Sequence, residues 1–151
     1  MAKIELGDIF EIGTNKGKAY FQCVNIDKLN CDTIKVFNKL YSEIPTSVVD
    51  VTKEQDYYFV GFALSTAYKR KLVEKVGNVP LPSDFELSKY MRSKHVIKGE
   101  FLGWDIINVV TLKRHFVEKL TTEQKRLSPW GIWNDTFLKE MLERGWNLEN
   151  W

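Results

Sequence analysis

The stretch IELGDIFEIGTNKGKAYFQCVNIDKLNCDTIKVFNKL, residues 4–40, determines the fold because it contains three strand-like runs joined by short polar turns. In residues 4–12, apolar and charged side chains alternate, which is typical of a strand with one buried face. Residues 18–27 carry apolar groups on both faces, which indicates a central strand. A turn at 28–30 leads into a third run, CDTIKVFNKL. We therefore predict a three-stranded antiparallel meander.

The next part of the chain changes character. Residues 41–56 are polar and contain a proline, so we expect a long loop there, with a short strand at 47–51. Residues 57–64, YYFVGFAL, are apolar on both faces and predict another buried strand. Gly61 inside that run marks either a bulge or a close approach of another backbone.

The segment from 68 to 91 is ambiguous. The apolar positions in 68–78 fit neither the helical nor the strand period, so both alternatives stay open there. The two prolines in VPLP, residues 79–82, exclude a helix across that stretch. Residues 83–86, SDFE, fit a capping box that would open one helical turn.

The C-terminal part contains a strand, a capped turn and the best helix. Residues 101–112 place apolar side chains on one face, and Thr121–Gln124 fits a capping box opening a short turn. Residues 135–144 predict a helix with Asn134 as its N-cap and Gly145 as its stop. One face of this helix is apolar and comprises Phe137, Leu138, Met141 and Leu142.

Early strands and a late helix together define the expected fold class. We predict an α+β, mostly β protein, with a twisted antiparallel, barrel-like sheet and a C-terminal helix that covers one end. The 151 residues amount to one domain's worth of chain, so we expect a single domain over 1–151.

Composition narrows the class of protein further. An apolar fraction of 44% and a charged fraction of 28% are ordinary for a globular protein, and the net charge is only +2. No apolar run approaches the ~18 residues of a membrane span, and the start, MAKIELGDIF, lacks the apolar core of a signal peptide. Two cysteines, Cys23 and Cys31, do not suggest a disulfide framework. We expect a cytoplasmic protein with reduced thiols and no membrane partner.

No residue pattern in the chain carries a recognisable catalytic chemistry. The two histidines, His95 and His115, lie twenty residues apart, and no zinc, phosphate-loop, nucleophile-elbow or dinucleotide motif occurs. The thiol of Cys23 is expected opposite residue 34 in the meander, so it does not face Cys31. We therefore predict no enzyme activity, no cofactor and no metal. The alternative is a hidden active site, which would require a deep pocket around one of the histidines.

Two features suit binding. Four of the five tryptophans lie in the last 22 residues, and aromatic anchors often dominate binding energy at interfaces. From these we select Trp130, Trp133 and Trp151 as candidate partner contacts, with packing in the core as the alternative for Trp130 and Trp133. Charge asymmetry is the second feature, because residues 66–98 are basic while the loop 41–56 is acidic. From the acidic loop we select Glu43, Asp50 and Glu54, with an ordinary solvated surface as the alternative.

The layout resembles the immunity protein 26 family of bacterial polymorphic toxin systems. The similar pieces are GDIFEI at 7–12, KAYFQCV, the hairpin into TIKVF, KLVEKVGNVPLP at 71–82 and the tail LTTEQKRLSPWGIWNDTFLKEML. They cover nearly the whole chain, although Leu72 stands where we expect a tryptophan in the family. The resemblance implies a mostly β protein that binds a cognate toxin in the cytoplasm of the producing cell and needs no cofactor. It identifies no contact residues.

We therefore predict an immunity protein that binds and neutralises a cognate toxin without catalysis. Because the chain is nearly neutral, we expect that this toxin is not a strongly basic nuclease held mainly by charge. The alternative is a small nucleic-acid-binding module that uses the basic region 66–98. The oligomeric state stays open.

Overall fold

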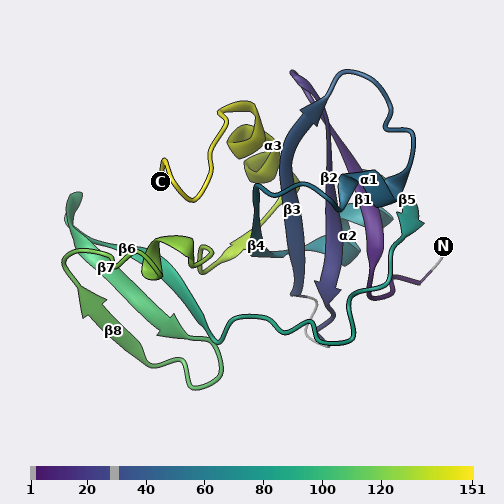
Figure 1. Cartoon of the computed structure of the whole chain (residues 1–151). Coiled ribbons are helices and arrows are strands. Elements are labelled where there is room, and N and C mark those ends of the chain that lie inside the picture. Colours follow the sequence, from purple (N-terminus) through teal and green to yellow (C-terminus); the bar gives the residue numbers. More distant parts are fainter. Residues whose placement is uncertain (1–2, 28–30) are drawn as a thin grey trace.

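The computed structural model of the protein describes residues 3–27 and 31–151 and consists mainly of antiparallel strands with a C-terminal helix (Figure 1). The predicted fold class is confirmed in these respects. The strands form two separate sheets, a six-stranded one and a three-stranded one, and do not close into a barrel within the described residues. The predicted turn at 28–30 lies outside the described residues.

The six-stranded sheet contains the predicted meander at its centre. Its strand order is β5-β1-β2-β3-β4-β9, and all its neighbours are antiparallel except β4 and β9. The register places Cys23 opposite Ile34, as expected from the sequence. In chain order the strands are β1 (Asp8–Thr14), β2 (Gly17–Asn25), β3 (Asp32–Tyr41), β4 (Tyr57–Phe62), β5 (Glu74–Asn78) and β9 (Ile132–Trp133).

Apolar side chains cover both faces of this sheet, which explains why the central strands lack simple alternation. The larger core cluster joins one face, including Phe10, Phe21 and Phe62, to the helix α3 (Asp135–Glu143). On the other face, a smaller cluster joins Phe37 to Val51 of the short helix α1 (Val48–Val51). A central strand between two packed layers must be apolar on both sides.

The terminal helix forms as predicted. The Asn134 side chain accepts a hydrogen bond from the backbone N–H of Phe137 at 2.8 Å, which is the N-cap interaction. The buried face consists of Leu138, Met141 and Leu142. Gly145 follows the helix with a φ of 67°, which is the left-handed conformation in which a glycine commonly ends a helix.

Three local predictions were wrong. The predicted strand at 47–51 is the helix α1, because the Ser47 hydroxyl accepts from the N–H of Val49 and caps it. Of the residues 83–86, only 83 and 84 form a turn, closed by the hydrogen bond from the N–H of Phe85 to the carbonyl of Pro82, and no helical turn follows. The strand predicted over 101–112 ends at Asn108, because the Asn108 side chain accepts hydrogen bonds from the backbone N–H groups of Val110 and Thr111 in the following turn.

Two open questions are answered. The ambiguous segment 68–78 contains both elements, because the helix α2 (Leu64–Lys69) is followed by β5 at the edge of the sheet. Gly61 marks a close backbone approach, since a Cβ atom there would lie 2.6 Å from the carbonyl oxygen of Gly131.

The three-stranded sheet lies to one side of the larger sheet (Figure 1). It comprises β6 (Tyr90–Ile97), β7 (Glu100–Asn108) and β8 (Arg114–Val117), in the order β6-β7-β8. The chain reaches it through residues 79–89, where two prolines cannot donate to a strand ladder and so end the larger sheet. It returns through the 3-10 helix η1 (Gln124–Arg126), and the predicted Thr121–Gln124 capping box is present in both directions.

Candidate partner-binding surface

The three candidate tryptophans lie in different surroundings. Trp133 is 9% exposed and belongs to the core, where its ring contacts Tyr58, Phe137 and Trp146. Trp151 is partly exposed and packs between Trp104 and Trp146. Trp130 is 37% exposed and lines a hollow of about 510 Å³ where β9 faces the start of β6. The structure therefore does not gather the three into one surface.

The acidic candidates lie at the opposite end of the molecule from the smaller sheet (Figure 1). Glu43 and Asp50 are exposed and Glu54 is partly exposed, and all three lie on or beside α1, which packs against β5. Asp50 forms an ion pair with Lys53, and Glu54 accepts from the backbone N–H of Asp56. These acids are accessible, but they share no surface with Trp130 or Trp151.

The basic region 66–98 is also divided by the fold. Its first part ends α2 and enters β5, where Lys75 pairs with the buried carboxylate of Asp8 at 3.0 Å. Its last part lies on β6 in the smaller sheet. Tyr68 packs its ring against Phe10 of the core, so of the two tyrosines in this region Tyr90, 47% exposed, is the accessible one.

Exposed apolar side chains concentrate instead on the smaller sheet. In the part of the chain that the structure describes, sixteen large apolar residues are exposed, and eight of them belong to residues 90–117. Five of them surround the end of the β6–β7 hairpin, each between 41% and 50% exposed. We call this group the hairpin patch: Val96, Ile97, Phe101, Leu102 and Phe116. Val96 and Phe101 pair on the face of Trp104, whereas Phe116 lies on the opposite face against His95, so the patch wraps around the hairpin end. Clustered exposed apolar groups mark interaction surfaces, and a partner would have to enclose this end of the hairpin.

Net charge differs between the smaller sheet and the rest of the chain. Residues 89–126 hold nine basic and four acidic residues, a net charge of +5, while the remainder holds thirteen and sixteen, a net charge of −3. Lys94 lies beside the hairpin patch, with its ammonium 5.8 Å from the centre of the Phe101 ring. The hairpin patch therefore has a basic surrounding.

The hairpin that carries the patch has a recognisable turn. Lys98 and Gly99 both have positive φ, 51° and 81°, which is the conformation of the tightest two-residue hairpin loops. The Lys-Gly pair between YMRSKHVI and EFLGWDII is the sequence signal that could have predicted this hairpin.

A cross-strand charged cluster joins all three strands on one face of the smaller sheet. Nδ1 of His95 lies 3.0 Å from Oδ2 of Asp105, and Nη1 of Arg114 lies 3.3 Å from the same oxygen. The Phe116 ring packs edge-on against the imidazole, 5.0 Å between centroids. An aspartate could orient this histidine as a base, but no hydroxyl or thiol of the described residues forms a hydrogen bond with it. The cluster therefore acts as a cross-strand link.

His115 belongs to the other face of β8, because successive side chains of a strand alternate. It lines a hollow of about 690 Å³ with Tyr90, Glu123 and Gln124. The two histidines therefore do not share a site. Within residues 3–27 and 31–151, no three His, Cys, Asp or Glu side chains lie close enough together to hold a metal ion.

A buried arginine lies under the smaller sheet where it meets the C-terminal tail. Arg92 is 1% exposed, and its Nε and Nη2 donate to the carbonyl oxygens of Leu127, Lys125 and Leu148 at 2.9–3.0 Å. Its guanidinium packs against the rings of both Trp104 and Trp151, which also contact each other edge-on. Burial lowers the pKa of Arg92 to about 10. A single arginine in a strand carries no signal of burial, so this residue could not be predicted from the sequence.

The chain shows no significant similarity to the protein families, curated proteins or solved structures with which it was compared. The resemblance to the immunity protein 26 family therefore stays a prediction from the sequence. None of the helices among the described residues is both long enough and apolar enough to span a membrane.

Proposed function

We propose that this chain is an immunity protein that neutralises a cognate toxin by binding it through the hairpin patch. The observation that supports this proposal is the grouping of five large apolar side chains, each at least 41% exposed, around one hairpin. When a partner covers an exposed apolar cluster, the free energy falls by roughly 25 cal/mol for each Å² of apolar area buried. Blocking a toxin requires a complementary surface and no reacting group.

The charge around the hairpin patch defines the chemistry of the partner. A net charge of +5 over residues 89–126 favours a toxin surface that is apolar in its centre and acidic at its rim. This agrees with the expectation that the toxin is not a strongly basic nuclease held by charge. Under this proposal the hairpin patch is the contact surface, and the acidic candidates Glu43, Asp50 and Glu54 lie outside it.

The test is a neutralisation assay with the toxin encoded by the gene next to that of this chain. Cells expressing this toxin should grow only when the chain is co-expressed, and the two purified proteins should form a complex. Phe101→Asp and Ile97→Asp place a charge in the hairpin patch and should weaken the complex by at least about ten-fold. Ile44→Asp is the matched control, since Ile44 is 76% exposed in the acidic loop.

Several outcomes contradict the proposal. If the toxin is neutralised equally by the wild type and by both patch variants, with their circular dichroism unchanged, the hairpin patch is not the contact surface. If Glu43→Lys with Glu54→Lys abolishes neutralisation instead, the acidic loop is. A neighbouring gene product that harms no cell, or that never binds this chain, contradicts the immunity function itself.

The second candidate function is binding of single-stranded nucleic acid. It is favoured by the contact between Lys94 and Phe101, because lysines beside exposed aromatic rings can hold phosphates while bases stack. Such binding would fall steeply between 50 and 500 mM salt, since it releases counterions. Contacts to an apolar toxin surface would change little over that range.

A further inference from the structure

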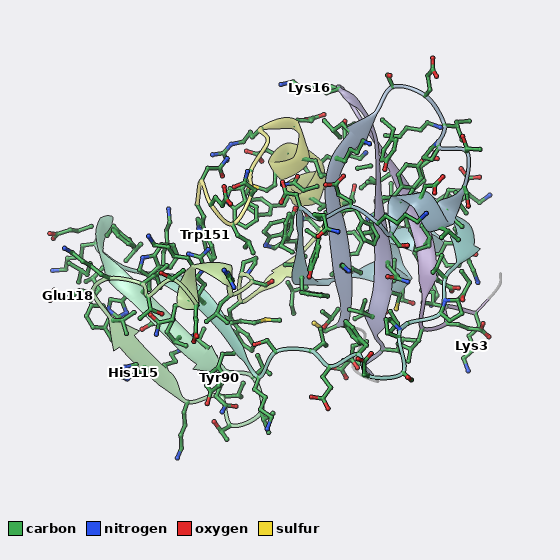
Figure 2. The ribbon with its side chains drawn as sticks, viewed as in Figure 1. Lys3, Lys16, Tyr90, His115, Glu118 and Trp151 are labelled. Atoms are coloured by element: carbon green, nitrogen blue, oxygen red, sulfur yellow. The ribbon has the colours of Figure 1, made fainter. Side chains whose placement is uncertain are left out.

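Arg92 forms part of the wall of a hollow of about 790 Å³ between the smaller sheet and the C-terminal tail. Cavities of roughly 300–1,000 Å³ are the usual size for small-molecule sites. The tryptophans Trp104 and Trp151 and the leucines Leu120 and Leu148 provide apolar walls. In Figure 2, Trp151 lies between the two sheets and Glu118 lies at the outer end of the smaller sheet.

The charge of Arg92 has no carboxylate partner among the described residues. Three backbone carbonyls accept from its Nε and Nη2, while its Nη1 donates to no described group. Carbonyl dipoles and indole faces stabilise a cation, but they supply no negative charge. A buried charge without a counter-charge is costly, so an anion beside Arg92 would be bound favourably.

Three more cations line the same hollow. Lys119, Lys125 and Arg126 are exposed, and in the described part of the chain none of them forms an ion pair. The acids Glu118 and Glu149 also line it, so four basic groups face two acidic ones. The hollow therefore combines a buried cation, an excess of positive charge and aromatic walls.

We propose that this hollow binds a small ligand that carries an oxyanion, a phosphate or carboxylate group, on an apolar or aromatic body. The oxyanion would lie against Nη1 of Arg92 with Lys119 and Lys125 above it, and the body would lie against the apolar walls. The volume exceeds that of a bare phosphate, which is why an organic body is included. This site is independent of the hairpin patch and of the proposed function.

The experiment is a calorimetric titration of the full chain with pyrophosphate, citrate, inorganic phosphate and adenosine monophosphate, with tryptophan fluorescence as a second readout. We expect saturable binding of one of the two multivalent probes. If pyrophosphate binds and citrate does not, the ligand carries a phosphate, and adenosine monophosphate should then bind more tightly than inorganic phosphate. If citrate binds and pyrophosphate does not, the ligand carries carboxylates.

The key variant changes Lys119, Lys125 and Arg126 to Gln and leaves Arg92 and the fold untouched. It should weaken binding by at least about ten-fold. A matched triple variant, Lys3→Gln, Lys16→Gln and Lys53→Gln, removes the same charge from the larger-sheet side of the molecule, where Figure 2 labels Lys3 and Lys16. It should bind as the wild type does. Loss of binding to the same degree in both triple variants, or no saturable binding of any probe, overturns the proposal.

Discussion

The guanidinium carbon of Arg92 lies 4.4 Å from the ring centre of Trp151, the last residue of the chain, and 4.7 Å from that of Trp104. Arg92 belongs to the smaller sheet, while the Trp151 ring also contacts Trp146 of the main core. The contact of this cation with the two indoles therefore connects the smaller sheet to the larger one through the tail. Ser128 adds a second connection, because its carbonyl accepts from Arg92 and its hydroxyl accepts from Phe59 in β4.

Trp151→Ala should destabilise the protein by about 1–3 kcal/mol, since it removes one cation–π contact and two ring contacts. Urea unfolding followed by circular dichroism measures this loss. The control is Trp130→Ala, because Trp130 is 37% exposed and makes no ring contact with a described residue. If 1–151 is a single domain, probes in both sheets should report one common transition. Equal effects of the two substitutions would contradict the role of Trp151 as the connection.

Gly103→Ala should destabilise the hairpin that carries the patch. A Cβ atom at this position would lie 2.6 Å from the carbonyl oxygen of Val117 and 2.8 Å from the Phe116 ring. We expect a cost of about 1–3 kcal/mol from this overpacking, seen as a lower Tm and faster amide exchange in β7 and β8. Gly13→Ala is the control, because no atom lies within 4 Å of a Cβ built there. Unchanged exchange in the hairpin of Gly103→Ala would show that the strands shift without cost.

Local patterns in the sequence were sufficient to predict the meander and the terminal helix. The Cys23–Ile34 register and the Asn134 cap depend on neighbours in the chain, so they could be derived from spacing alone. The capping box at Thr121–Gln124 is local in the same sense. Such features depend on hydrogen bonds between residues that are close together in the chain, so the residue types and their spacing can be recognised in the sequence.

The smaller sheet and the candidate surface could not be predicted in this way. The connection at 79–89 would allow β7 either to extend the first meander or to form a second sheet. Which of the two forms depends on tertiary pairing between strands. Burial of Arg92 and Trp133, and exposure of Phe101, also follow from which faces meet in space. A tryptophan-rich tail can form part of a core or of an interface, and in the structure Trp133 lies in the core.

Asp32→Asn should stabilise the protein at neutral pH. Asp32 is 4% exposed, and burial raises the pKa of its carboxyl above the usual value. A raised pKa means that the folded state favours the protonated form, so stability falls as the pH rises above the ordinary carboxyl pKa and the loss is complete above the raised pKa. Asparagine removes this cost and keeps the acceptor for the backbone N–H of Asp27. The gain should vanish as the pH falls and Asp32 becomes protonated in both states.

Thermal unfolding between pH 3 and pH 7 measures this effect, and Asp84→Asn provides the control at an exposed aspartate. The difference between Asp32→Asn and the wild type should grow with rising pH, whereas that of the control should stay constant. A gain for Asp32→Asn that is larger at pH 3 than at pH 7 would contradict the raised pKa.

Cys23 should stay unlabelled by thiol reagents as long as the protein is folded. Its side chain is buried, and burial raises the pKa of the thiol to about 12. Because the thiolate is the nucleophile, only about one molecule in 10,000 would be reactive at pH 8, even with full access. Cys31 is partly exposed and its pKa is raised mainly by burial, so it should react slowly.

Cys31→Ser should therefore abolish labelling of the folded protein with an aromatic disulfide reagent, whereas Cys23→Ala should leave the labelling rate unchanged. Since urea exposes both thiols, two groups should then react in the wild type, and labelling of Cys23 faster than unfolding would contradict its burial.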